Sequence, residues 1–255
     1  MIDLGLFEWI VSIIVGILIG VSKTAIATLG IFNVALLAQV FSVKESVGIM
    51  LPMLIAGDVF AVIYFRRSVV WAHLFSLLPW VLAGLFAGFF VLWKVNSEQL
   101  TLLLGVLILV LIILQTAKDY INSKIDQHLL NSNSNWFTYS MGILAGFATM
   151  IGNVSGVIMS IYLMAKGLPK KEFIGTGAWF YLFVNIIKIP FYMGLGIITA
   201  ESFTFNLTMI PFILIGAYAG ILVLKYIPQK MFHRIILVLG TIGAIKLIFP
   251  NLFLF

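Results

Sequence analysis

Eight apolar runs divide the chain, and each is long enough to cross the hydrocarbon core of a bilayer as a helix. They cover about residues 6–40, 46–65, 70–93 and 97–117, and then 136–165, 172–195, 203–224 and 232–249. A membrane-spanning helix needs about 20 mostly apolar residues. The runs do not show the alternating pattern of a transmembrane β-barrel, whose strands have about ten residues. The sequence therefore predicts an all-α polytopic membrane protein.

Composition and charge agree with this class. Hydrophobic residues make up 62% of the chain and charged residues 9%, whereas soluble domains carry about 25% charged residues. The net charge of +6 arises from Lys and Arg in short loops between apolar runs, where membrane proteins keep their orienting charges. We therefore expect the lipid bilayer, and no nucleic acid, as a partner. The absence of cysteine excludes disulfides and Cys-ligated metals.

The second half of the chain repeats the spacing of the first. Gly16, Gly20 and Gly30 recur 126 residues later as Gly142, Gly146 and Gly156, and Pro79, Gly84 and Gly88 recur 132 residues later as Pro211, Gly216 and Gly220. Small changes in the offset are what loop insertions between duplicated segments produce. We predict two homologous transmembrane repeats, 1–117 and 136–255, joined by a polar cytoplasmic linker at 118–135 that is rich in Asn and Ser.

The first run of each repeat is predicted to be broken. A straight helix of ~34 residues would reach about 50 Å, well beyond a hydrocarbon core of ~30 Å. Small and polar residues gather within these runs, in GVSKTAIATLG at 20–30 and GFATMIGNVSG at 146–156. Non-helical backbone at membrane depth is tolerated only where protein or a water-filled cavity surrounds it. Each repeat should therefore have a broken or re-entrant first helix followed by three transmembrane helices.

The basic residues favour a topology in which each broken segment enters and leaves the membrane on the same side. If every run crossed once, the loops on the two sides would hold eight and four basic residues. With hairpins at the first and fifth runs, one side keeps only Lys44 and Lys94. The other side then holds Arg66, Arg67, Lys118, Lys124, Lys166, Lys170, Lys171, Lys225, Lys230 and Arg234. Because basic loops face the cytoplasm, both termini are expected outside. Three full crossings per repeat would make the repeats inverted relative to each other.

The first break contains a candidate site for an anion. Lys23 lies within apolar sequence, where a charge is costly unless it faces a protein interior or a cavity. Free N–H groups at half-helix N-termini would add to its attraction for an anion. The alternative is a snorkelling or ion-paired lysine, with Asp58 as one possible partner. The candidate substrate-binding residues are Ser22, Lys23, Thr24 and Thr28 in the first break, and Thr149, Asn153 and Ser155 in the second, whose polar groups could instead serve helix packing.

Three further polar residues fall at comparable depth on equivalent helices. Asp58 aligns with Asn185 across the repeat, and Lys188 follows Asn185 by about one helical turn. Asp58 and Lys188 are expected to lie close together. Two interpretations remain open: a buried structural ion pair, and a role of Asp58 in carrying a coupling proton.

An enzyme is not expected. Gly20-Val21-Ser22 is similar to the nucleophile motif of intramembrane serine proteases, but Ser22 and Lys23 are adjacent and do not face each other on a helix. No second buried acid accompanies Asp58, and no HExxH spacing is present. The sequence also lacks a Walker-type nucleotide-binding motif, so any transport would use an ion gradient or the gradient of the substrate. No cofactor or metal is predicted.

The chain resembles the sulfite exporter TauE/SafE family of bacterial membrane permeases. The resemblance rests on the glycine-rich break at 20–30, the run Val43 to Gly48 with its echo from Lys170 to Gly175, and the paired PxxxxGxxxG elements at 79–88 and 211–220. It implies export or uptake of small sulfur-containing anions such as sulfite or sulfonates.

We therefore expect a secondary transporter that works by alternating access in the cell membrane, the inner membrane if the source is bacterial. A proton or sodium ion is the possible coupling ion. A non-transporting membrane scaffold or assembly factor and an anion channel remain the alternatives.

Overall fold

The computed structural model describes residues 5–25, 27–124 and 135–223, with isolated positions at 238, 241, 242, 245, 248 and 249. Within these residues the chain is helical and contains no strand. The helices are α1 (Leu6–Thr24), the 3-10 turn η1 (Ala27–Leu29), α2 (Gly30–Leu37), α3 (Val43–Phe65), α4 (Trp71–Lys94), α5 (Ser97–Lys124), α6 (Asn135–Gly152), α7 (Gly156–Ala165), α8 (Lys170–Gly194) and α9 (Ala200–Val223). The all-α prediction is confirmed for this part of the chain.

Two of the segments predicted from the sequence lie partly or mostly outside the described residues. Helix α5 continues to Lys124 and so occupies the first residues of the predicted linker at 118–135, while residues 125–134 lie outside the described part. The eighth apolar run, 232–249, also lies outside it except for the isolated positions. The described helices therefore account for seven of the eight predicted runs.

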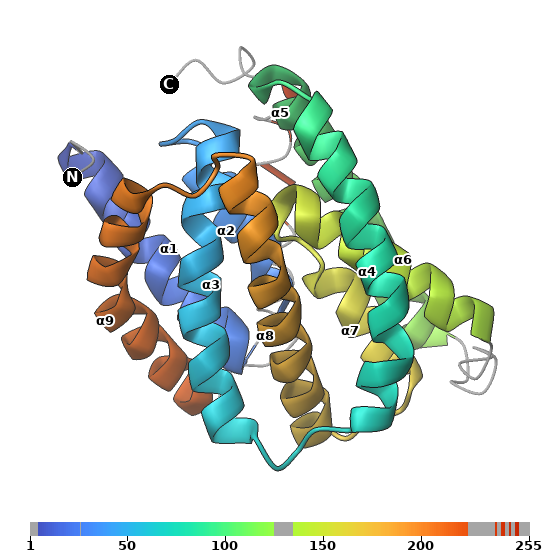
Figure 1. The fold of residues 1–255 in the computed structure, drawn as a ribbon. Coiled ribbons are helices and arrows are strands. Elements are labelled where there is room, and N and C mark those ends of the chain that lie inside the picture. Colours follow the sequence, from blue (N-terminus) through green and yellow to red (C-terminus); the bar gives the residue numbers. More distant parts are fainter. Residues whose placement is uncertain are drawn as a thin grey trace.

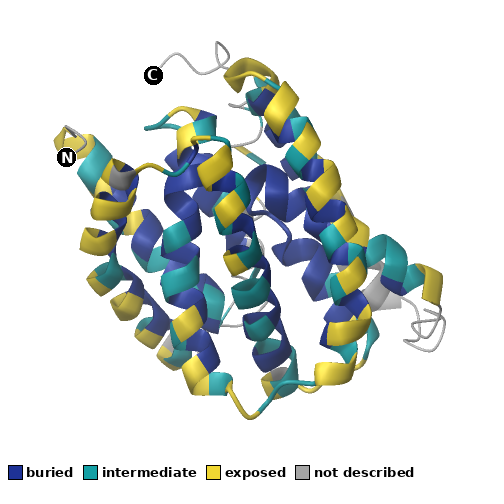
Figure 2. Cartoon of the chain, in the orientation of Figure 1, coloured by how far each residue is buried: buried dark blue, intermediate teal, exposed yellow. Residues whose placement is uncertain are grey.

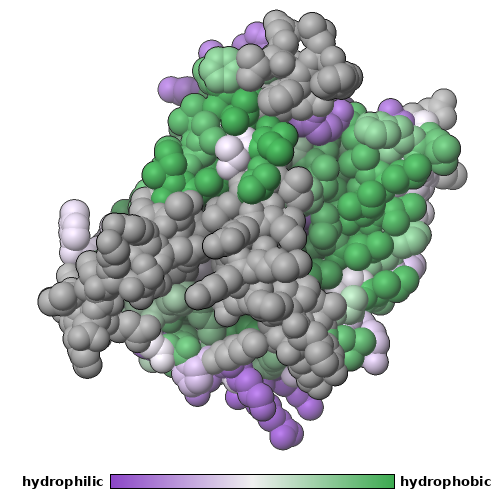
Figure 3. Space-filling model, turned by 180° about the vertical axis from the view of Figure 1, so that it is seen from behind, coloured by the Kyte–Doolittle hydropathy of each residue, from purple (hydrophilic) through white to green (hydrophobic). Residues whose placement is uncertain are grey.

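Among the described helices, five are long and apolar enough to cross a membrane: α1, α3, α4, α8 and α9. Their outward faces carry large apolar side chains, which Figure 2 shows as exposed residues around a buried centre. Phe75, Phe90 and Ile215 are examples, each more than half exposed. Figure 3 shows green, hydrophobic residues over the middle of the described face and purple, hydrophilic residues at the upper and lower ends. Water would disfavour so much apolar surface, whereas lipid tails would cover it.

Both first runs are interrupted where their small and polar residues cluster. Helix α1 ends at Thr24 and α2 begins at Gly30, with the turn η1 between them; α6 ends at Gly152 and α7 begins at Gly156. Helix α1 has 19 residues, which corresponds to about 28 Å. Helix α2 (Gly30–Leu37), which follows it after the break, is shorter and spans only part of that distance. Figure 1 shows α1 and α3 both beginning at the upper end of the molecule, as a same-side hairpin requires.

Equivalent helices of the two halves run in opposite directions. In Figure 1, α3 runs from the upper to the lower end and α8 from the lower to the upper end. Helices α4 and α9 are likewise opposed, since α4 rises and α9 descends. Each pair joins helices that occupy corresponding places in the repeated sequence.

The first helix of each half packs against the other half at glycines. A Cβ at Gly20 would overlap the backbone of Ile213 on α9, and a Cβ at Gly146 would overlap the backbone of Val81 on α4. These contacts are equivalent, because Gly146 is 126 residues after Gly20 and Ile213 is 132 residues after Val81. The same correspondence holds for Gly216 against Ile17 and Gly84 against Ile143. Small residues let the helix backbones approach closely, so the GxxxG elements serve packing.

Helices α3 and α8 lie side by side at the centre of the molecule (Figure 1). They carry Asp58 and Asn185 at fully or nearly fully buried positions. The two helix breaks approach these positions from opposite halves, since η1 of the first break contacts α7 of the second. The fold thus brings the predicted polar residues toward one region.

Candidate functional site

A small space with several polar side chains in its lining lies between the two helix breaks. We call it the central site. Its polar lining comes from the end of α1, from the second break and from α8: Ser22, Lys23, Thr149, Asn153, Ser155, Tyr181 and Asn185. Ala27, Gly30, Leu54 and Gly156 complete the wall. Five of the seven predicted substrate-binding residues therefore line one common space.

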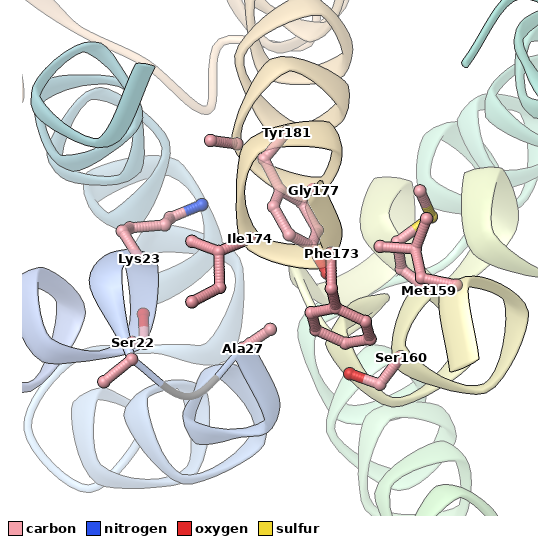
Figure 4. Close-up of a pocket in the computed structure, with 12 residues that line it drawn as sticks. Ser22, Lys23, Ala27, Met159, Ser160, Phe173, Ile174, Gly177 and Tyr181 are labelled. Carbon is pink, nitrogen blue, oxygen red and sulfur yellow. The ribbon is translucent and has the colours of Figure 1, made fainter. Parts of the chain in front are cut away.

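A second small space adjoins the central site. It shares Ser22, Lys23, Ala27 and Tyr181 with the central site and is otherwise mostly apolar. Figure 4 shows Ser22, Lys23 and Ala27 on one side of it, with Phe173, Ile174, Gly177 and Tyr181 of α8 and Met159 and Ser160 of α7 around the rest. We call this second space the apolar passage. Its lining residues Phe173 and Ile174 lie near the start of α8, which begins at the lower end of the molecule (Figure 1), so the passage lies toward that end.

The second break is held open by Asn153. Its backbone has φ 58, a left-handed conformation that asparagine adopts more readily than most residues. The side-chain amide donates a hydrogen bond to the carbonyl of Val47 on α3, at 3.1 Å. The chain therefore turns at Asn153 while its side-chain oxygen accepts a hydrogen bond from Lys188 of α8, and α7 begins three residues later at Gly156.

Asp58 forms its ion pair with Lys23. The Lys23 Nζ atom lies 2.7 Å from Asp58 Oδ1, and the two side chains are 8% and 0% exposed. The Asn185 amide donates a 2.7 Å hydrogen bond to the other carboxylate oxygen. The Lys23 ammonium also lies 4.6 Å from the centre of the Tyr181 ring. Of the two partners weighed from the sequence, the structure brings Lys23 and not Lys188 into the ion pair with Asp58.

Lys188 has a different environment, made of neutral groups. Its side chain is fully buried, and its ammonium donates to Thr149 Oγ1 at 3.3 Å, to Asn185 Oδ1 at 3.4 Å and to Asn153 Oδ1. The ring of Tyr192 lies 5.1 Å away. No acidic side chain of the described residues forms an ion pair with it. The cluster therefore contains two lysine side chains and a single carboxyl group.

The remaining predicted residues divide by orientation. Thr24 donates to the carbonyls of Gly20 and of Ala217 on α9, so it faces the helix contact and lies outside the lining of the central site. Ser22 lines the site while donating to the carbonyl of Ile19 at 2.7 Å. The side chain of Thr28 lies outside the described part of the structure.

Tyr181 is the residue that sequence reasoning missed. It lines both spaces and covers the Lys23 ammonium. An aromatic residue in an apolar run gives no signal by itself, because most such residues only fill the core. Its position four residues before Asn185 places both on one face of α8, and that spacing could have marked it.

Broken helices that meet around a buried charged cluster, within a bundle of apolar helices, are the plan of secondary membrane transporters. The chain matches the model of the family described as sulfite exporter TauE/SafE over residues 12–247. This match covers nearly the whole chain, so the protein belongs to the TauE/SafE family, as the sequence resemblance predicted. The family is one of membrane transporters of sulfur-containing anions, and the chain is a multi-pass membrane protein. No curated protein and no solved structure gave a match.

Proposed function

We propose that the protein is a secondary transporter that carries a small sulfur-containing anion, of the sulfite or sulfonate class, through the central site. The observation that carries this proposal is the environment of Lys188, a fully buried ammonium among neutral acceptors. A buried charge without a counter-charge is strongly disfavoured. An anion in the adjoining central site would supply the missing counter-charge.

The charge of the cluster sets the kind of ligand. Lys23 and Asp58 neutralise each other at 2.7 Å, which leaves one positive charge at Lys188. A monoanion would neutralise that charge and so lower the cost of burying it at membrane depth. The Ser155 hydroxyl and the second N–H of the Asn153 amide, both at the second break, line the site and would supply hydrogen bonds that suit the several oxygens of a sulfur oxyanion. The Ser22 hydroxyl already donates to the carbonyl of Ile19.

The two halves are proposed to be inverted repeats that rock against each other. The opposed directions of α3 and α8 and of α4 and α9 support this relation. The reciprocal glycine contacts of α1 with α9 and of α6 with α4 support it independently. Each contact forms a unit that joins both halves, and rocking of such units around a fixed midplane site is the general scheme of alternating access.

Orientation in the membrane follows from the basic loops. Arg66, Arg67 and the start of α8 lie at the lower end in Figure 1, while α1 and α9 begin at the upper end. With basic loops in the cytoplasm, the upper end and the termini would face outward. The apolar passage would then connect the central site to the cytoplasmic side.

Transport by purified protein in sealed liposomes tests the proposal. Liposomes preloaded with unlabelled sulfite or ethanesulfonate should accumulate the same labelled anion transiently, because a carrier exchanges one molecule for another. A channel would equilibrate the anion without this counterflow, and a scaffold would give no flux above empty liposomes.

Thermal unfolding in sulfite, sulfate, thiosulfate and ethanesulfonate tests binding alone. An anion that binds should stabilise the protein by about 2.7 kcal/mol when its concentration is 100 times its dissociation constant.

A further inference from the structure

We propose that Asp58 is a proton-binding site whose protonation promotes anion binding, so that the protein carries one proton with each anion. This inference rests on the anion site proposed above and assigns its coupling ion. It starts from the position of Lys23. Lys23 lines both the central site and the apolar passage, whereas Asp58 is fully buried behind it.

The ion pair blocks Lys23 from an incoming anion. Its ammonium already faces Asp58 Oδ1 at 2.7 Å, so a second negative group would meet both the cation and a nearby carboxylate. Like charges repel strongly where water is excluded. Protonation of Asp58 removes that repulsion and releases the Lys23 ammonium toward the central site.

Asn185 connects the same event to Lys188. Its Nδ2 donates to Asp58 Oδ2 at 2.7 Å, and its Oδ1 accepts from Lys188 at 3.4 Å. An ionised carboxylate can only accept, so it holds the amide in this orientation. A protonated Asp58 can donate to Oδ1 instead, which allows the amide to turn. The turned amide would place its N–H groups where Oδ1 now accepts from Lys188. Lys188 would then lose this acceptor, and its ammonium would be available to the oxygens of the anion.

No other charged group of the described residues takes part. Asp58 interacts electrostatically with Lys23 of α1 and with Lys188 of α8, and the buried phenol of Tyr181 on α8 also interacts with it electrostatically. Helix α9 places Ile213 near Gly57, the neighbour of Asp58, and α2 and α5 bring it no charge. A proton can reach Asp58 through Lys23: the ammonium passes its proton to the carboxylate and is reprotonated from the space that it lines.

Coupling follows from reciprocity. If a bound proton strengthens anion binding, a bound anion strengthens proton binding by the same factor. The doubly loaded cluster holds two ammonium groups, a neutral Asp58 and the anion, and so carries one more positive charge than the site with anion alone. A proton gradient would then bias the direction in which the anion accumulates.

Proton uptake by the wild-type protein is the direct test. Methanesulfonate and ethanesulfonate are suitable probes, since both remain monoanions near neutral pH. In weakly buffered detergent solution above the titration midpoint of Asp58, binding of either probe should take up about one proton, and affinity should fall about tenfold per pH unit. Binding that is independent of pH, with no proton uptake, would overturn the proton site and leave the anion site standing.

The variant Asp58→Asn imitates the neutral carboxyl. It should bind the probes at alkaline pH as tightly as the wild type does at acidic pH, without proton uptake, and should equilibrate the anion without proton-driven accumulation. Glu201→Gln is the matched control, because it removes an exposed carboxylate at the outer end of α9 and should behave as the wild type. If the variant does not fold, the wild-type measurement still decides. If neither probe binds at any pH, the proton site is overturned, and the sulfite measurements above decide whether the anion site survives.

Discussion

At the residue scale, the two buried lysines differ in what neutralises them. Lys23 has a carboxylate at 2.7 Å, and Lys188 has only neutral acceptors among the described residues. Replacement of each lysine by methionine should therefore mainly affect stability at position 23 and anion binding at position 188. Loss of Lys23 strands a buried carboxylate, whereas loss of Lys188 removes the charge that an anion would neutralise.

Lys188→Met should weaken anion binding while the protein still folds. Methionine keeps much of the apolar stem of lysine, so packing beside Tyr192 changes little. A hydrogen bond to a charged group contributes about 1.5 to 3 kcal/mol, which corresponds to roughly ten- to a hundred-fold in affinity. Thermal shifts with sulfite and ethanesulfonate measure the loss. An unchanged affinity in a folded variant would contradict the assignment of Lys188.

Lys23→Met should instead act mainly on stability. Removal of one partner from a buried ion pair costs about 3 to 5 kcal/mol, because the other charge stays buried. The double variant Lys23→Met with Asp58→Asn removes both charges and should recover most of that loss. Unfolding of both single variants and the double variant in the same detergent gives the comparison. Simple addition of the two single effects would show that the ion pair does not form in the protein.

At the element scale, the glycine contacts hold each first helix against the opposite half. Gly146→Ala should destabilise the protein by about 1 to 3 kcal/mol, because its Cβ would press on the backbone of Val81 and neither helix can move without losing its packing. Gly177→Ala is the matched control within a helix. Its Cβ would meet Leu163 and Tyr181 at 3.7 Å, an ordinary contact. Equal stability of the two variants in thermal unfolding would refute the close approach of α4 and α6.

The breaks were predictable from the sequence, whereas the pairing of charges around them was not. Gly20 to Gly30 and Gly146 to Gly156 gather residues that tolerate non-helical backbone, so their spacing alone indicated where α1 and α6 end. The partner of Asp58 depends instead on the direction in which Lys23 leaves the last turn of α1. Thr24, its neighbour, points to Ala217 on α9. Rotation at a helix end is set by tertiary packing, which spacing does not encode.

At the scale of the whole molecule, the proposed orientation can be tested with single cysteines, because the chain has none of its own. Ser42→Cys and Glu201→Cys should react with a membrane-impermeant thiol reagent added outside intact cells. Ser42 directly precedes α3 and Glu201 lies in the first turn of α9, and both helices begin at the upper end in Figure 1. Arg67→Cys, at the lower end, should react only after the membrane is opened. Labelling of position 67 from outside would reverse the orientation. Labelling of position 42 only from inside, with the N-terminus outside, would contradict the same-side hairpin.

The crossed glycine contacts also bear on the ancestry of the chain. Helix α1 lies on α9 and α6 lies on α4, so neither half covers the glycine face of its own first helix. A half expressed alone would leave that glycine face exposed, and a second copy of the half in the opposite orientation would cover it. If the two halves are the inverted repeats proposed above, their interface corresponds to that of an antiparallel dimer of half-length chains that exchange their first helices.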